Sequence, residues 1–286
     1  MNKNLLDLSG KIDELTVELL KTIDDVAESL KAPFFVVGAI ARDIILTQGY
    51  GIETGRATQD FDLAVKVSDW NGYEQLREGL IASGKFIHDR KQAQRLIYKN
   101  KYPIDIIPFG AISGPDSLLS WPPEHDTIID THGFTEAYDN SITVRIQEEP
   151  IIDIQFVSLP GLAILKLISW NDNQLRRRKD AHDLLLIMRT YLDAGNLERL
   201  YDEEMDLVEG DFDYVRAGSR LLGRDIAKIL SPDIREIIVN ILIKETAEQT
   251  LYRLVEDMLD IGAESRVFEN TLQLTKDLKT GILERQ

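Results

Sequence analysis

The chain has 286 residues, a net charge of −16 at neutral pH and no cysteine. The lack of cysteine excludes disulfides and thiolate metal sites. The negative charge means that any contact with nucleic acid needs a local basic patch. Hydrophobic residues make up 43% and charged residues 29%, as in soluble globular proteins, and the length suits two domains. No apolar run approaches the ~20 residues of a membrane span and no signal-peptide pattern is present, so we expect a cytoplasmic protein without a membrane partner.

The first half of the chain combines helical and strand-like segments. Residues 4–31 carry apolar side chains three or four apart, which predicts one or two amphipathic helices that end before Pro33. Strands are expected at residues 34–37, 60–65, 85–88, 94–99, 102–108, 142–147 and 151–156. Asn100-Lys101 predicts a hairpin turn between two of these strands, and residues 110–141 predict a long loop with at most a short helix.

Two motifs near the first strand point to a common chemistry. The strand ends at Gly38, and a helix-like run follows from Ala39 to Leu46, so backbone N–H groups at its start favour a phosphate. Asp60 and Asp62 alternate on a strand and therefore face the same side, where a divalent metal would relieve their repulsion. A tight turn at the glycine and a solvated acidic face are the alternatives. The two motifs in this order favour an enzyme that handles nucleoside triphosphates.

A third carboxylate is predicted on a neighbouring strand. Asp105 lies between Ile104 and Ile106 in the segment 102–108, and burying a carboxylate among isoleucines is costly unless it is paired or binds a metal. We therefore expect Asp105 to join the first two acids. The alternative is an acid on an edge strand that faces water.

The second half of the chain is predicted to be helical, with domains at residues 1–157 and 158–286. Lys166 lies on an otherwise apolar helix and must reach an acid or a ligand phosphate. Asp180 and Asp183, three residues apart at the start of the next helix, share a face. Catalysis is one role for these acids, and helix capping with pairing to Lys166 is the other.

Three segments together resemble a known superfamily. Residues 38–43, Gly-Ala-Ile-Ala-Arg-Asp, are similar to the motif G-[GS]-x-x-R-D, and residues 58–62, Thr-Gln-Asp-Phe-Asp, to T-x-D-x-D. These motifs belong to the nucleotidyltransferase superfamily that includes DNA polymerase β, the CCA-adding enzymes and the AbiEii/MenT-type toxins. Lys166 and the later Lys179-Asp180-Ala181-His182-Asp183-Leu184 resemble the AbiEii/MenT pattern most closely. Ala39 departs from the usual Gly or Ser and has no hydroxyl for a phosphate.

The resemblance implies an α+β fold: a nucleotidyltransferase-type mixed sheet with flanking helices, followed by a helical C-terminal domain. It also implies transfer of a nucleoside monophosphate from an NTP to an acceptor. Asp60, Asp62 and Asp105 would hold two Mg²⁺ ions about 4 Å apart. Gly38 and Ala39 would bind the outer phosphates, and Arg42 or Lys166 would add positive charge.

The acceptor and the partner are open at this point. The AbiEii/MenT resemblance implies a toxin that modifies RNA, such as tRNA, and is held in check by an antitoxin protein. An RNA acceptor would need a basic surface that leads to the three acids. The sequence offers two basic groups for it: Arg90, Lys91, Arg95 and Lys99, and residues 176–179. Ordinary solvated charge is the alternative for both groups. A small-molecule acceptor and a non-catalytic nucleotide-binding protein are the alternative functions.

Overall fold

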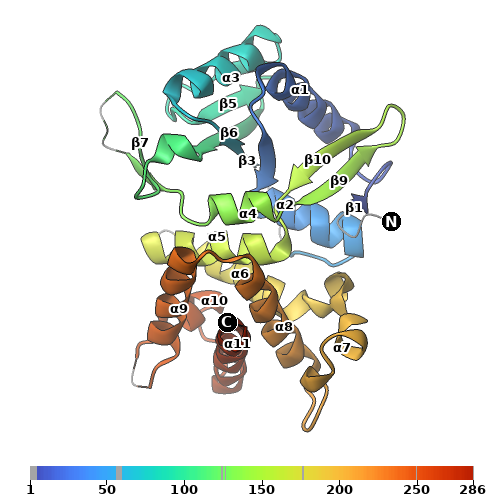
Figure 1. Cartoon of the computed structure of the whole chain (residues 1–286), viewed down its shortest axis with the longest axis vertical. Helices are drawn as coiled ribbons and strands as arrows, with labels where there is room; N and C mark the ends of the chain where they lie inside the picture. The colour runs from blue at the N-terminus through green and yellow to red at the C-terminus, as the bar shows by residue number, and fades with distance from the viewer. Residues whose placement is uncertain are drawn as a thin grey trace. The chain divides into compact units, whose positions relative to one another are not determined.

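The computed structural model describes residues 5–55, 60–123, 125, 127–175, 177–248 and 250–285 (Figure 1). The chain divides into two compact units, residues 1–158 and 159–286. Each unit is described by itself below. Over the described residues, no helix has both the length and the apolar surface that crossing a membrane requires.

The first unit is built on a mixed sheet, which confirms the predicted fold class. Its eight described strands lie in the order β1-β9-β10-β2-β3-β6-β5-β4. Their bounds are β1 Leu5–Asp7, β9 Ile142–Gln147, β10 Ile152–Phe156, β2 Phe34–Val37, β3 Phe61–Lys66, β6 Tyr102–Phe109, β5 Arg95–Tyr98 and β4 Phe86–His88. At the centre, β3 pairs antiparallel with β2 and parallel with β6. The central strands carry buried apolar side chains, which is why the sequence shows short hydrophobic runs there.

The start of the chain differs from the helix expected over residues 4–31. Leu5–Asp7 is a strand that pairs parallel with β9, from Leu5 opposite Thr143 to Asp7 opposite Arg145. The helix α1 begins only at Glu14 and ends at Leu30, with the Asp13 side chain accepting the N–H of Thr16 as its N-cap. Gly10, which has a positive φ of 72°, separates the strand from the helix.

Helices cover both faces of the sheet (Figure 1). On one side lie α1 and α3 (Trp70–Ala82), which approach closely because α3 has Gly79 opposite Val26. On the other side lie α2 (Gly38–Asp43) and α4 (Phe134–Asp139). A turn of π-helix, Ile44–Gly49, continues α2, so the predicted helix is confirmed and extends further than Leu46.

Residues 110–141 contain more regular structure than the long loop expected there. A 3₁₀ turn at Ala111–Ser113 leads into a two-stranded antiparallel sheet of β7 (Leu118–Ser120) and β8 (Ile128–Asp130). Trp121 packs edge-on against Trp70 and Tyr73 of α3, with ring centroids 5.0 and 5.4 Å apart. This aromatic packing holds the segment against α3.

The second unit is helical, as predicted. Its elements are α5 Leu159–Asp172, α6 Arg178–Thr190, a π-helical turn Leu192–Asn196, α7 Arg199–Asp202, a 3₁₀ turn Met205–Leu207, α8 Tyr214–Ile229, α9 Pro232–Thr246, α10 Arg253–Met258 and α11 Ser265–Glu284. The helices α8 and α11 cross at glycines. A Cβ on Gly223 would lie 2.2 Å from the Leu278 carbonyl oxygen, and one on Gly281 would lie 2.0 Å from that of Arg220. Only glycine permits this backbone contact.

Candidate active site

Four neighbouring strands bring the candidate residues of the first unit into one row. Val37 of β2 is the register partner of Asp62 in β3, Asp62 is that of Asp105 in β6, and Asp105 is that of Arg95 in β5. Side chains of register partners on adjacent strands lie on the same face of a sheet. Asp62 and Asp105 therefore lie side by side, and Asp60, two residues before Asp62, faces the same way.

Gly38 lies directly against the second acid of this row. An ideal Cβ built on Gly38 would be 2.0 Å from Oδ2 of Asp62 and 2.8 Å from its carboxyl carbon. The residue also has a positive φ of 73°, which side-chain-bearing residues rarely adopt. The strand-to-helix turn at Gly38 thus brings bare backbone against the Asp62 carboxylate, and both conditions require glycine.

Arg95 supplies the positive charge between the acids. Its Nε donates to Oδ1 of Asp105 at 2.7 Å and its Nη2 to Oδ2 at 2.8 Å, while Nη2 lies 4.0 Å from Oδ2 of Asp60. The side chains of Arg95 and Asp105 are only 19% and 16% exposed, whereas Asp60 is 56% exposed. The hydrogen bonds to Asp105 hold the pKa of Arg95 above its usual range. From the sequence, Arg95 was expected to bind RNA, but in the structure it contacts Asp105 and Asp60.

The α2 segment holds its own ion pair. Arg42 is buried, and its Nε and Nη2 donate to Oδ1 of Asp43 at 2.9 and 2.5 Å. Gly38 and Ala39 are half-buried at the start of α2, and Val37, the residue before the helix, makes no side-chain cap. Thr58 and Gln59 of the second motif lie outside the described residues.

Lys166 belongs to the second unit, where it is buried between two acids. Its Nζ lies 2.6 Å from Oδ1 of Asp180 and 2.7 Å from Oδ2 of Asp183, and the three side chains are 11%, 9% and 3% exposed. Burial opposes the charge of the ammonium group, but the two carboxylates outweigh burial and raise the pKa of Lys166. The pairing that the sequence offered as one of two roles for these acids is therefore present.

The acids of the first unit have oxygen ligands suited to Mg²⁺, but they are not arranged around a single metal position. In the described part of the chain, no group of three acid or histidine side chains is arranged to hold a metal ion. Asp60 and Asp62 present carboxylate oxygens, which Mg²⁺ prefers, whereas both oxygens of Asp105 accept bonds from Arg95. Asp60 and Asp62 thus have the ligand chemistry of a magnesium site, whereas Asp105 fits a metal only if its bonds to Arg95 break.

The basic residues proposed for RNA are partly neutralised by acids. In the first group, Arg95 pairs with Asp105 and Lys99 with Glu18 of α1, at 2.5 Å. In the second group, Arg176 lies outside the described residues. Arg177 lies 3.8 Å from Asp180, and Arg178 lies 3.9 Å from Asp257.

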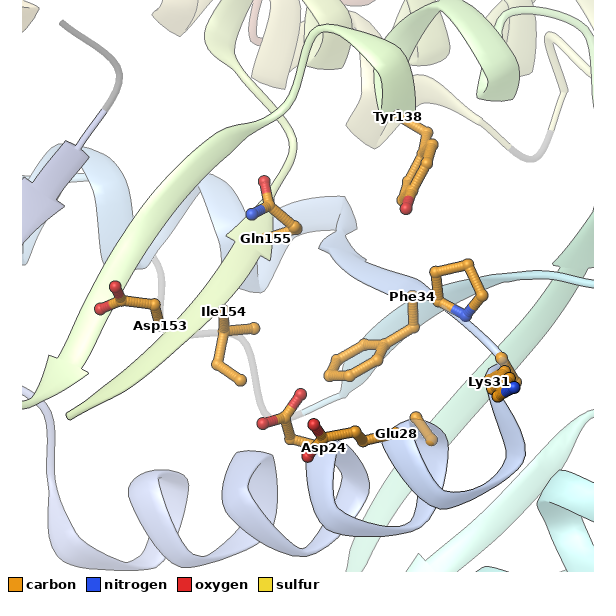
Figure 2. A pocket seen from close by; sticks show the side chains of 11 residues that line it. Asp24, Glu28, Lys31, Phe34, Tyr138, Asp153, Ile154 and Gln155 are labelled. Atoms are coloured by element: carbon orange, nitrogen blue, oxygen red, sulfur yellow. The ribbon is translucent and has the colours of Figure 1, made fainter. Parts of the chain in front are cut away.

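A pocket of about 430 Å³ lies elsewhere in the first unit (Figure 2). Its lining includes Asp24 and Glu28 of α1, Phe34 of β2 and Tyr138 of α4. Phe34 is opposite Val65, whereas Val37 is opposite Asp62, so the pocket and the acids lie at opposite ends of β2. This pocket is therefore separate from the candidate active site.

The family of the chain follows from a match that spans most of its length. The model of the family described as "Nucleotidyl transferase AbiEii toxin, Type IV TA system" matches residues 25–260. The chain belongs to the AbiEii nucleotidyltransferase family. The matched range includes the strand-glycine-helix unit, the three acids of the first unit and Lys166, so this AbiEii-family chain is a nucleotidyltransferase, as its sequence motifs predicted.

Solved structures resemble the AbiEii-family chain at low sequence identity. ANT(2'')-Ia in complex with adenylyl-2''-tobramycin is 11% identical, with 67% of this chain and 96% of that chain covered and a TM-score of 0.37. JHP933 from Helicobacter pylori is 13% identical, with 96% and 94% covered and a TM-score of 0.33. The Thermotoga maritima CCA-adding enzyme complexed with tRNA is 14% identical, with 97% and 83% covered and a TM-score of 0.29. No curated protein sequence matches the chain.

Proposed function

We propose that the row of Asp62, Asp105 and Arg95, closed by Gly38, is the active site of a Mg²⁺-dependent enzyme that transfers a nucleoside monophosphate from an NTP to an acceptor. The observation that supports this most is the contact of Gly38 with Asp62. It places the start of α2, where phosphates are favoured, directly beside the acid pair. A substrate with a triphosphate and a bound divalent cation needs both features together.

The candidate residues take the following proposed roles. Asp60 and Asp62 would hold the metal, which when bound neutralises charge on the triphosphate. The backbone at Gly38 and Ala39 would bind the outer phosphates, with Arg42 adding positive charge from α2. A catalytic role for Lys166, Asp180 and Asp183 is proposed from their resemblance to the AbiEii/MenT sequence pattern.

The reaction itself is a displacement at the α-phosphorus. An acceptor oxygen forms a new bond to that phosphorus, the bond to the bridging oxygen of the β-phosphate breaks, and pyrophosphate leaves. The proton of the acceptor hydroxyl must go to a base. Asp105 is the candidate, because it lies beside Asp62 in register.

We further propose that a protein antitoxin restrains the activity, because the matched family is described as the toxin of a type IV system. RNA is the proposed acceptor because of the sequence resemblance to the AbiEii/MenT-type toxins. A small-molecule acceptor is the second candidate. It is favoured because Arg95 and Lys99 form ion pairs with Asp105 and Glu18. The first basic group therefore offers less positive charge to a polynucleotide than the sequence alone suggests.

One experiment tests the activity and separates the two acceptors. The purified chain is incubated with Mg²⁺, each NTP labelled at the α-phosphate, and either total RNA or an RNA-free small-molecule extract. We expect transfer of label to RNA that falls steeply with salt, and loss of transfer in Asp62→Asn. Asp25→Asn, which changes an exposed acid on α1, should keep it. Label only in the small-molecule pool would support the second acceptor, and no labelling with any NTP would contradict the proposed enzyme.

A further inference from the structure

Arg95 occupies a place that the proposed metal site needs. Its guanidinium makes two parallel hydrogen bonds to Asp105, at 2.7 and 2.8 Å, and one of the same nitrogens lies 4.0 Å from Asp60. The guanidinium therefore lies between two of the three acids that were predicted to share metal ions. Paired hydrogen bonds between a planar guanidinium and a carboxylate are strong and fix geometry.

A divalent cation and Arg95 cannot share Asp105 in this arrangement. Both carboxylate oxygens already accept hydrogen bonds from Arg95, and a guanidinium does not lose its proton in a protein. The metal would also be repelled by the fixed positive charge. For Asp105 to bind the metal or take a proton, the guanidinium must first move away.

We propose that Arg95 is a positioning residue that holds Asp105 out of the metal site until the metal displaces it. The site at rest then consists of Asp60 and Asp62, and Asp105 joins only when its bonds to Arg95 break. This inference rests on the proposed function, because it assumes a metal at Asp60 and Asp62. It adds a second step to metal binding, with an internal cation as the competitor.

The same sheet contains a matched arginine–aspartate pair for comparison. Arg145 of β9 faces Asp153 of β10 in register, and its Nε and Nη2 donate to the two oxygens at 2.8 and 3.0 Å. The side chains are 23% and 33% exposed, so burial is similar to that of Arg95 and Asp105. This second pair lies away from β3 and β6 in the strand order, which makes it a control with the same chemistry and no metal site.

Mn²⁺ binding to the full chain, followed by the electron paramagnetic resonance signal of free Mn²⁺ without nucleotide, tests the proposal. Arg95→Ala should bind Mn²⁺ more tightly than the wild type, roughly tenfold, because a half-buried ion pair lies between the weak exposed and strong buried cases. Arg145→Ala should leave the affinity unchanged. The ammonium group of Arg95→Lys cannot make the paired contact, so its Mn²⁺ affinity should lie between those of the wild type and Arg95→Ala. This variant replaces Arg95→Ala in the test if Arg95→Ala fails to fold.

The mechanism is isolated by adding Asp105→Asn. If Arg95 acts by occupying Asp105, the effect of Arg95→Ala on Mn²⁺ affinity should shrink when Asp105→Asn is also present, leaving only the part due to the charge of Arg95. An effect of undiminished size would mean that Arg95 acts only through its charge, and equal affinities of wild type and Arg95→Ala would also overturn the proposal. In both cases Asp62→Asn should still weaken binding, which leaves the proposed function intact. If Asp62→Asn has no effect on Mn²⁺ binding, the proposed metal site is wrong and this inference fails with it.

Discussion

The Asp62 carboxylate fills the space that a side chain on Gly38 would need, with Oδ2 only 2.0 Å from the position of an ideal Cβ. The contact is made between β3 and the turn that leads from β2 into α2. It joins the two sequence motifs physically, because neither a larger residue at position 38 nor a shifted Asp62 is compatible with it.

Gly38→Ala should therefore inactivate the enzyme. The new methyl group must push Asp62 aside, and φ of 73° adds roughly 1 kcal/mol of strain. We expect kcat/KM for NTP transfer to fall by about 100-fold or more, since displacement of a catalytic group by 1 Å has costs on this scale. Gly51→Ala is the control: its φ is 71°, but nothing lies within 4 Å of its Cβ position. Equal activity of the two variants would contradict the role of the contact.

The sequence predicted this part of the site because the signals are local. A buried strand, a glycine and a helix follow each other directly, and alternation alone places Asp60 and Asp62 on one face. The pairing of Lys166 with Asp180 and Asp183 was also accessible, since a lysine on an apolar helix needs a nearby acid.

The role of Arg95 was missed because it depends on the register of one hairpin. A two-residue turn at Asn100-Lys101 would place Leu96 opposite Asp105. The structure instead has a three-residue connection, with Tyr98 opposite Tyr102, and this brings Arg95 opposite Asp105. A difference of one residue exchanges the face of every side chain. The strand Leu5–Asp7 was missed for a related reason, because three residues carry no periodicity and its partner β9 lies far along the chain.

Lys166→Met should destabilise the second unit. The change leaves Asp180 and Asp183 buried without their cation, and breaking such a pair costs about 3–5 kcal/mol. Urea denaturation followed by circular dichroism measures the loss. Lys21→Met, which removes an exposed ion pair with Asp25, should cost no more than about 1 kcal/mol.

A further variant separates the stability role of Lys166 from catalysis. Lys166→Met combined with Asp180→Asn and Asp183→Asn removes all three charges and should recover much of the lost stability. If the cluster takes part in nucleotidyl transfer, this variant is folded but inactive. A folded and active variant would show that the cluster only stabilises the second unit.

Gly223→Ala should strongly destabilise the crossing of α8 and α11. Its Cβ would lie 2.2 Å from the Leu278 carbonyl oxygen, so the helices must separate. We expect a loss of about 3 kcal/mol, at the upper end of the cost of overpacking. Gly72→Ala in α3 is the control, because its nearest neighbour would be 3.7 Å away and alanine favours a helix by about 1 kcal/mol. A melting temperature for Gly223→Ala that matches the wild type would contradict the close crossing.

The second unit should lose stability in acid through carboxylates that are paired with arginines. Burial alone would raise the pKa of Asp225, but bonds from Arg199, Lys228 and Tyr191 outweigh it and lower the pKa below 3.8. Bonds from Arg220 and Arg224 likewise lower the pKa of Glu284 below 4.5 against the effect of burial. A carboxylate with a lowered pKa in the folded state stabilises the protein above its ordinary pKa, and this contribution is lost as the pH falls through the folded value.

Urea denaturation at pH values from 6 down to 3 should therefore show a falling midpoint that begins below about pH 5. Arg199→Met should flatten this dependence, because Asp225 then loses the arginine that lowers its pKa. It should also lower the midpoint at pH 6, where the ion pair is intact in the wild type. Arg145→Met, which breaks an ion pair of the first unit, should leave the acid slope of the second unit's transition unchanged. An Arg199→Met variant with the wild-type slope would show that Asp225 does not contribute to acid unfolding.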